Sequence, residues 1–289
     1  MEAARARPAA ETQRAGLLNR PTATRDRLDA GAIRSGLAAR GEAIPVEALA
    51  RCGSTNTELL SRPFSREPAL LLADEQTAGR GRRGRRWHSD PGTALMFSLR
   101  WAFDGDLASL RGLSLAAGVS LARSLRNLGA GGVLLKWPND LLVSTAGTEG
   151  AKLGGILVET RTSGGRVVAV VGVGLNCRRV PGLEARLGRR IASLEQVLAP
   201  MPSRNDLAVP IAAGLAQALR DFGAAGFEPF KARWEALHAH QGTSLRVRTG
   251  DGRRISGVAD GVAADGALLL RNRRGVHFVH SGTVLGSAA

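Results

Sequence analysis

Short apolar runs on both sides of one long helical segment constrain the fold of this chain most. In that segment, apolar residues recur at three- and four-residue steps from Leu107 to Leu128, and Gly129 stands where a helix would end. A layout of this kind, with strands around a long helix, predicts an α/β arrangement built on one dominant sheet. The runs of strand length are Leu70–Ala73, Ala94–Trp101, Val133–Trp137, Gly155–Glu159 and Val167–Val173.

The two ends of the chain differ from this middle part. Residues 1–27 are rich in Ala, Arg and Thr without sustained apolar periodicity, so we expect a disordered tail, followed by a short amphipathic helix that ends near Gly41. After Pro200 and Pro202, a helix that Asn205 can cap is expected, and Trp234 marks a last helix. From residue 242, four or five short strands are separated by Gly-containing turns. The expected units are therefore residues 1–27, 28–241 and 242–289.

Composition narrows the class of protein. No run of about 18 uncharged apolar residues occurs, and the N-terminus lacks the apolar centre of a signal peptide, so we expect a cytoplasmic protein with no membrane partner. Cys52 and Cys177 are the only cysteines, and no Cys/His cluster accompanies them. A disulfide framework and a structural zinc site are both disfavoured.

A formal net charge of +15 raises the possibility of a nucleic-acid partner. Against it, Tyr is absent and aromatic residues make up only 4% of the chain, which leaves little for base stacking. Charge alone leaves both interpretations open.

The densest chemical feature is the segment from Gln76 to Trp87, which holds five arginines between Arg80 and Arg86, interleaved with Gly81 and Gly84. Glycine lets a backbone approach an anion closely, and arginine supplies forked donors that match phosphate oxygens. The segment fits a phosphate-binding loop, but alone it fits a solvated or RNA-binding basic loop equally well.

Four further segments join polar residues to predicted strand ends, where ligands of such sheets gather. Lys136-Trp-Pro-Asn-Asp140 combines a cation with oxygen ligands suited to Mg²⁺. Lys152 precedes two glycines and a buried run, and Gly172-Val-Gly-Leu-Asn176 ends a strand with an amide. Ser54-Thr-Asn56 precedes a helical stretch, where helix capping is the simpler interpretation.

Taken together and in this order, these segments resemble the biotin protein ligase family. The resemblance implies an α+β fold with a central mixed sheet packed with helices, related to class II synthetases and biotin/lipoate ligases, and a small C-terminal SH3-like β-barrel. Some relatives begin with a DNA-binding domain, but only 27 residues precede Leu28, so we expect the type without one and no DNA partner.

The resemblance also implies roles for individual residues. Lys152 and Arg82 would be catalytic, bridging the biotin carboxylate and the ATP α-phosphate, and Asp140 would bind Mg²⁺. ATP would contact Arg82, Lys136, Asn139, Asp140 and Asn176. Biotin would contact Ser54, Thr55, Asn56, Gln76, Gly79, Arg80, Gly81, Arg82, Trp87, Lys152, Gly172 and Gly174.

The implied reaction activates biotin with ATP as biotinyl-AMP, releases pyrophosphate and transfers biotin to a lysine of a biotin carboxyl carrier protein. The enzyme would be a monomer or a homodimer. Two alternatives stay open: a lipoate or octanoate ligase or transferase of the same fold, and an Arg-rich nucleic-acid-binding protein. The discriminating assay offers biotin and lipoic acid side by side.

Two departures from the family pattern matter. The connection from Ser144 to Ala151 is longer than usual, which affects the placement of Lys152. Relatives often end their last strand with Leu-Arg, whereas this chain has Leu285-Gly286, so we expect Asn176 to take more of the nucleotide contact.

Overall fold

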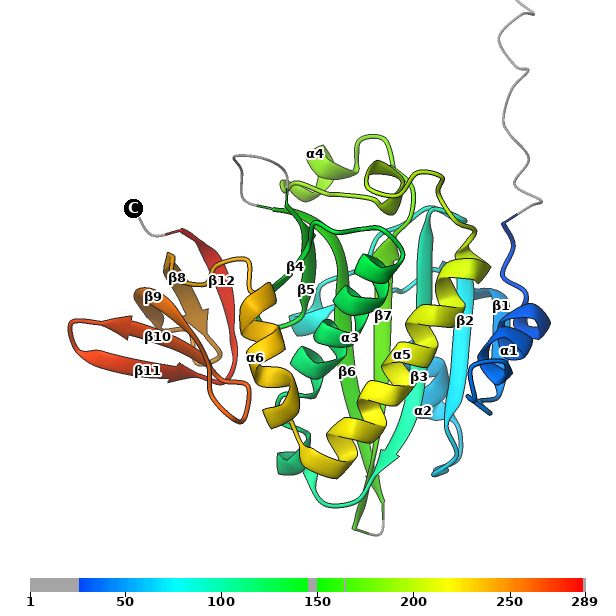
Figure 1. The fold of residues 1–289 in the computed structure, drawn as a ribbon, viewed down its shortest axis with the longest axis horizontal. Coiled ribbons are helices and arrows are strands. Elements are labelled where there is room, and N and C mark those ends of the chain that lie inside the picture. Colours follow the sequence, from blue (N-terminus) through cyan, green and yellow to red (C-terminus); the bar gives the residue numbers. More distant parts are fainter. Residues whose placement is uncertain (1–25, 145–149, 164, 288–289) are drawn as a thin grey trace, which may run out of the picture.

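A computed structural model describes residues 26–144, 150–163 and 165–287, and residues 1–25 of the expected tail lie outside that range. A seven-stranded sheet forms the centre, in the order β1-β2-β3-β7-β6-β5-β4 (Figure 1). Only the β1–β2 pair is parallel, so the sheet is mixed, as expected. Its strands are β1 (Val46–Cys52), β2 (Ala69–Gln76), β3 (Ala94–Phe103), β4 (Val133–Lys136), β5 (Asp140–Val143), β6 (Ala151–Ser163) and β7 (Arg166–Asn176).

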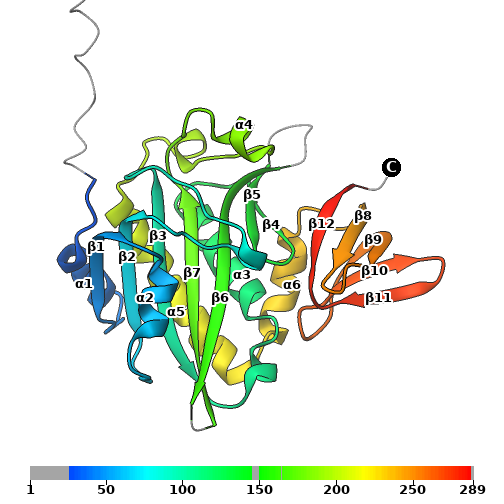
Figure 2. The ribbon, with the colours of Figure 1, turned by 180° about the vertical axis from the view of Figure 1, so that it is seen from behind.

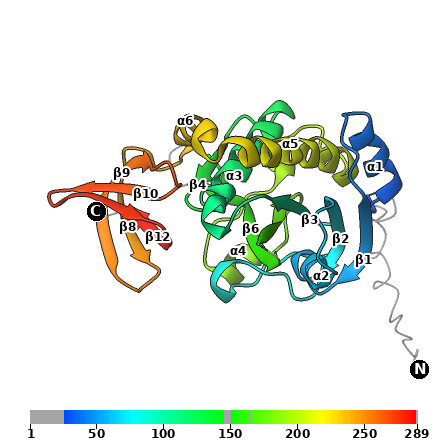
Figure 3. The ribbon, with the colours of Figure 1, turned by 90° about the horizontal axis from the view of Figure 1, so that it is seen from below.

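Helices cover both faces of this sheet. In Figure 3, α1 (Ala30–Ala38), α3 (Leu113–Asn127), α5 (Arg204–Ala225) and α6 (Glu228–Leu237) lie on one face, and α2 (Thr55–Ser61) lies on the other. The short α4 (Leu183–Leu187) sits in the connection from β7 to α5. The apolar periodicity of α3 and α5 buries their inner faces against the strands, which leaves the α2 face of the sheet free to form a site.

The long helix expected from Leu107 to Leu128 is two elements. A 3-10 turn (Leu107–Leu110) ends before Gly112, whose φ of 83° is left-handed, and α3 starts one residue later. A Cβ at Gly112 would lie 2.7 Å from the ring of Phe227, so only glycine fits this break. The spacing correctly predicts the buried face within α3, but it does not predict the interruption or the exposed position of Leu107.

The start of α5 corrects the expected cap and the boundary of the tail. The Ser203 side chain, not that of Asn205, accepts the Asp206 backbone N–H, because α5 begins two residues earlier than a cap at Asn205 would place it. Asn205 instead donates to the Arg27 carbonyl. Asp26 pairs with Arg204, which is 2% exposed and also bonds Asp74, so the folded part includes residues 26 and 27.

The expected C-terminal strands form a separate five-stranded antiparallel sheet, ordered β11-β10-β9-β8-β12, which we call the C-terminal sheet (Figure 2). It is joined to the main body by Trp137 Nε1, which donates to the Gly266 carbonyl over 3.1 Å. No helix in the described part is long and apolar enough to cross a membrane. The strands are β8 (Ser244–Thr249), β9 (Arg254–Val262), β10 (Leu268–Asn272), β11 (Gly275–Val279) and β12 (Gly282–Ser287).

Candidate active site

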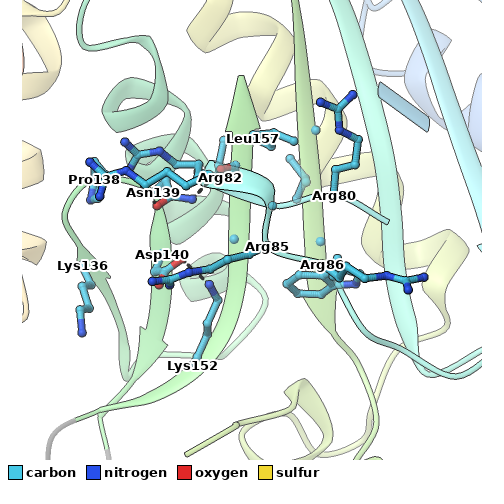
Figure 4. A pocket seen from close by; sticks show the side chains of 18 of the residues that line it. Arg80, Arg82, Arg85, Arg86, Lys136, Pro138, Asn139, Asp140, Lys152 and Leu157 are labelled. Carbon is cyan, nitrogen blue, oxygen red and sulfur yellow. Dashed lines mark hydrogen bonds and ion pairs between the residues drawn. The ribbon is translucent and has the colours of Figure 1, made fainter. Parts of the chain in front are cut away.

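A cavity of about 640 Å³, here called the main cavity, opens on the α2 face of the central sheet. Its walls come from α2, β6, β7, the Arg-rich loop at residues 80–87, the turn after β4, and β12 of the C-terminal sheet (Figure 4). All the site residues expected from the sequence line it except Gly79 and Asn176. These are Ser54, Thr55, Asn56, Gln76, Arg80, Gly81, Arg82, Trp87, Lys136, Asn139, Asp140, Lys152, Gly172 and Gly174.

One end of the main cavity is a buried network of neutral polar groups. Ser98 Oγ lies 2.6 Å from both the Thr55 hydroxyl and the Asn56 carbonyl oxygen. The Asn56 oxygen can only accept, so the single Ser98 hydrogen goes there and Thr55 donates to Ser98. Gln76 Oε1 in turn accepts the Thr55 backbone N–H over 2.8 Å. Ser98 was not among the predicted site residues, because a serine inside a strand has no local sequence pattern of its own.

Glycines in β7 make room for this end. A Cβ at Gly172 would lie 2.2 Å from Asn56 Oδ1, and one at Gly174 would lie 2.8 Å from the ring of Trp87. Trp87 is held by its backbone N–H, which donates to the Gly79 carbonyl over 2.9 Å. Gly79 therefore supports the wall without lining it. Trp87 Nε1 is buried and has no hydrogen-bond partner in the described part of the chain, so a ligand acceptor there would satisfy it.

The Arg-rich loop folds over the cavity as a compact hairpin-like turn. Gly81 N–H donates to the Arg85 carbonyl over 2.7 Å, and Arg83 in the turn is left-handed, with a φ of 57°. Arg83 Nη1 and Nη2 donate to Thr283 and Ser281 of the C-terminal sheet over 3.1 and 3.2 Å. The loop is thus fastened to the C-terminal sheet.

The opposite end of the cavity is strongly basic. Lys152 Nζ forms a hydrogen-bonded ion pair with Asp140, and burial lowers the pKa of Lys152, while Asp140 opposes that shift. Asn139 Nδ2 donates to the Ile156 carbonyl over 2.8 Å, and Arg82 Nη1 lies 3.4 Å from Asn139 Oδ1. Figure 4 shows the guanidinium of Arg82 near Asn139 and the Lys152 side chain directed toward Asp140.

Nine Lys and Arg side chains line the main cavity, against the single carboxylate of Asp140. Such an excess of cations favours a ligand with several negative charges. Five of them were not among the site residues predicted from the sequence. Arg83, Arg85 and Arg86 stand in the Arg-rich run, whereas Arg189 and Arg190 come from the connection after β7, far from any motif. Arg189 and Arg85 also contribute to the lowered pKa of Lys152, after burial.

Asn176, at the end of β7, does not line the main cavity. Its buried amide donates to the Ala192 and Lys152 carbonyls over 3.0 and 3.2 Å. The Lys152 backbone N–H in turn donates to Arg190 O over 3.1 Å. Asn176 therefore ties the strand of Lys152 to the segment that carries the additional arginines. The ATP contact expected of Asn176 stays a prediction.

Comparison with known proteins agrees with this geometry. Residues 49–176 match the biotin/lipoate A/B protein ligase family. The bifunctional ligase/repressor BirA of Escherichia coli is 38% identical over 221 residues, which cover 75% of this chain and 66% of BirA. The biotin--[acetyl-CoA-carboxylase] ligase of Paracoccus denitrificans is 34% identical over 233 residues, covering 78% of this chain and 94% of that protein.

A solved structure extends the likeness to the whole fold. The biotin protein ligase from Aquifex aeolicus in complex with biotin and ATP superimposes with a TM-score of 0.69 at 27% identity, covering 83% of this chain and 97% of that one. The chain belongs to the biotin/lipoate A/B protein ligase family. Its similarity to proteins named as biotin ligases places it on the biotin branch of that family. The match to BirA spans about two thirds of that protein's length.

Proposed function

We propose that this chain activates biotin with ATP to form biotinyl-AMP and then transfers biotin to the ε-amine of a lysine on a biotin carboxyl carrier protein. The observation that carries the proposal is a single cavity with a neutral hydrogen-bonding end and a basic end. Biotin has the matching halves: a neutral ureido ring and a carboxylate tail. The Aquifex aeolicus relative, which is in complex with biotin and ATP, supports both ligands.

The neutral end suits the ureido group. Its carbonyl and N–H groups need polar partners, which Ser54, Thr55, Asn56 and Gln76 supply from buried or half-buried positions. Because Thr55, Asn56 and Gln76 already form hydrogen bonds to one another or to Ser98, these three side chains are held in place before ligand binds. Trp87, packed on Gly174, forms an apolar wall for the rest of the bicycle.

The basic end suits the chemistry of activation. The biotin carboxylate attacks the α-phosphorus of ATP, so two anions must approach each other before pyrophosphate leaves. Lys152 and Arg82 would reduce this repulsion and stabilise the charge on the phosphate oxygens. Arg82 never gives up its proton, and its role is therefore electrostatic.

Lys136 and Asn139 would contact the nucleotide, and Asp140 would hold Mg²⁺. Mg²⁺ is commonly bound by one or two carboxylates together with substrate phosphates and water, so one aspartate at a phosphate site is a sufficient protein ligand. The residues present fit that requirement, although no group of three or more acidic, His or Cys residues occurs in the described part. When bound, the ion would neutralise phosphate charge.

The closed Arg-rich loop has a role in the second half of the reaction. Biotinyl-AMP is a mixed anhydride that water hydrolyses, so a cover over the cavity preserves it until the acceptor amine arrives. Gly81, Gly84 and the contacts of Arg83 keep this cover in a defined closed form.

A direct assay tests the proposal. The protein is incubated with biotin, Mg·ATP and a biotin carboxyl carrier domain, and biotin on the carrier is detected with labelled avidin. A carrier whose acceptor lysine is replaced by arginine is the control, and lipoic acid replaces biotin in a parallel reaction. We expect transfer of biotin only. Lipoate transfer without biotin transfer would assign the chain to the lipoate side of the family.

A further inference from the structure

A second cavity, of about 320 Å³, lies behind Arg82 on the other side of the main cavity's wall. It is bounded by the start of α3, the turn after β4, the middle of β6, and the C-terminal sheet around Asp265 and Gly266. Its volume is about ten times that of a water molecule in the liquid, enough for one extended side chain. The proposed chemistry of the main cavity leaves this space unused.

The two cavities are neighbours with a common wall. Arg82, Trp137, Pro138 and Ile156 line both of them. At this point the central sheet has a free edge: β5 pairs with β6 only up to Gly155, and the Ile156 N–H bonds the Asn139 carbonyl. Beyond Ile156, no strand of the described part pairs with β6 on its β5 side. The second cavity therefore adjoins the main cavity at an unpaired edge of β6, next to Arg82.

Transfer of biotin raises a problem of access. The acceptor amine must reach the carbonyl carbon of biotinyl-AMP, yet the Arg-rich loop lines the main cavity and is fastened to the C-terminal sheet by Arg83. Opening that loop for the amine would also admit water. We propose that the second cavity is the entrance through which the acceptor lysine of the carrier protein reaches the adenylate while the loop stays closed. This inference rests on the proposed function.

The lining of the second cavity suits a lysine side chain. Leu115, Ile156, Val158 and Ala267 offer an apolar wall for its four methylene groups. The mouth is charged and exposed: Asp265 lies 3.1 Å from His280 Nδ1 and 3.9 Å from Arg111. Arg111 lies just before α3, and Asp265 and His280 lie in the connections between strands of the C-terminal sheet, so a carrier resting at this mouth would contact both parts of the molecule.

The step at the inner end is aminolysis. The neutral amine donates its lone pair to the carbonyl carbon of biotinyl-AMP, and a C–N bond forms. The bond from that carbon to the phosphate oxygen breaks, and its electron pair leaves with AMP. The surplus proton of the amine passes to water. Arg82, at the boundary between the cavities, faces the phosphate that departs.

Val158 provides the test, because it lines the second cavity but not the main one and is half-buried. Val158→Phe narrows the entrance, Val158→Ala widens it, and Val276→Phe is a control on exposed β11. Three rates are measured: biotin-dependent ATP–pyrophosphate exchange, single-turnover transfer from preformed adenylate to the carrier, and capture of the adenylate by hydroxylamine, a much smaller amine.

We expect Val158→Phe to slow transfer to the carrier about tenfold or more while exchange stays within about twofold. Hydroxylamine capture, which needs little space, should fall less than transfer to the carrier. Val158→Ala and Val276→Phe should transfer at about the wild-type rate. The proposed entrance would be contradicted if Val158→Phe transferred biotin to the carrier at the wild-type rate, or if its exchange and transfer rates fell by the same factor. Absence of exchange in the wild type would instead overturn the proposed function itself.

Discussion

At the scale of single residues, Lys152 is the most informative side chain. Replacing it by alanine removes the cation that the proposed mechanism places between carboxylate and α-phosphate, so biotin-dependent pyrophosphate exchange should fall at least about 100-fold. Asp140 is 23% exposed and water can solvate it, so the fold should survive. Exchange kinetics and thermal melting check both points.

The matched control for Lys152 is Lys231→Ala, since Lys231 forms an ion pair with Glu235 on α6 far from the cavity. It should retain wild-type exchange. Near-normal exchange in Lys152→Ala would remove Lys152 from the mechanism.

Gly174 tests the wall that Trp87 forms. A methyl group there would lie 2.8 Å from the indole ring, so Gly174→Ala must displace Trp87 toward the space assigned to biotin. We expect the KM for biotin to rise about tenfold or more, with a smaller change in kcat. Gly131→Ala is the control, because a Cβ at Gly131 meets nothing within 4 Å. Equal biotin KM values in the two variants would show that Trp87 does not border biotin.

Site residues that belong to short motifs could be identified from the sequence. Site residues that only tertiary folding brings to the cavity could not. Asn56 and Lys152 stand beside glycines or in polar clusters that mark them. Ser98 lies inside an apolar strand, and Arg189 reaches the cavity only because the connection after β7 returns to Lys152. Neither has a local pattern, because their positions depend on tertiary contacts between distant segments.

At the scale of elements, the apolar periodicity correctly predicted which faces are buried. It did not show where elements break, because breaks depend on particular neighbours. Gly112 ends a turn because Phe227, in the distant connection between α5 and α6, occupies the space of its Cβ. β5, which begins at Asp140, was not predicted, because its four residues are too few for a periodic signal.

The Arg-rich loop carries a prediction at this scale. If Arg83 fastens the loop to the C-terminal sheet, Arg83→Ala should expose the loop to trypsin several-fold faster and increase loss of biotinyl-AMP to water. Removing its partners, in a Ser281→Ala and Thr283→Val double variant, should have a similar effect with all loop arginines retained.

Combining both sets of substitutions distinguishes a direct contact from separate damage. Because they remove the same hydrogen bonds, their effects on adenylate loss should be clearly less than additive. Arg253→Ala, which removes an exposed ion pair with Asp251, is the control and should leave adenylate loss unchanged. Fully additive effects would contradict the contact.

At the scale of the whole molecule, the two sheets form one site. Gly282, Thr283, Val284 and Leu285 of β12 line the main cavity, although the sequence suggested a separate small domain there. The overall charge also changes meaning. Nine of the basic side chains line one cavity, so part of the +15 charge that raised a nucleic-acid partner is placed around a small-ligand site.

His238 lies at the junction between the main body and the C-terminal sheet, and it makes the stability of this junction sensitive to pH. It packs on Trp234 with ring centroids 4.5 Å apart, and the next residue's N–H bonds the Leu135 carbonyl. Burial lowers the pKa of His238 to about 4 from 6.5. Between pH 6.5 and about pH 4, His238 therefore binds a proton in the unfolded chain but not in the folded chain. The free energy of unfolding that His238 contributes above pH 6.5 is lost as the pH falls through this range, by up to about 3 kcal/mol.

His238→Phe removes that proton site while keeping a buried ring. We expect the free energy of unfolding of the wild type, measured relative to this variant in urea, to fall by about 2 to 3 kcal/mol between pH 7 and about pH 4.5. His277→Phe, in the C-terminal sheet, should follow the wild type. Ala239 contacts β4 and lies in the connection that leads to β8 of the C-terminal sheet. The loss of stability at low pH should therefore appear as cooperative unfolding of both sheets. If the difference in the free energy of unfolding between the wild type and His238→Phe does not change with pH, His238 is not the source of the acid sensitivity.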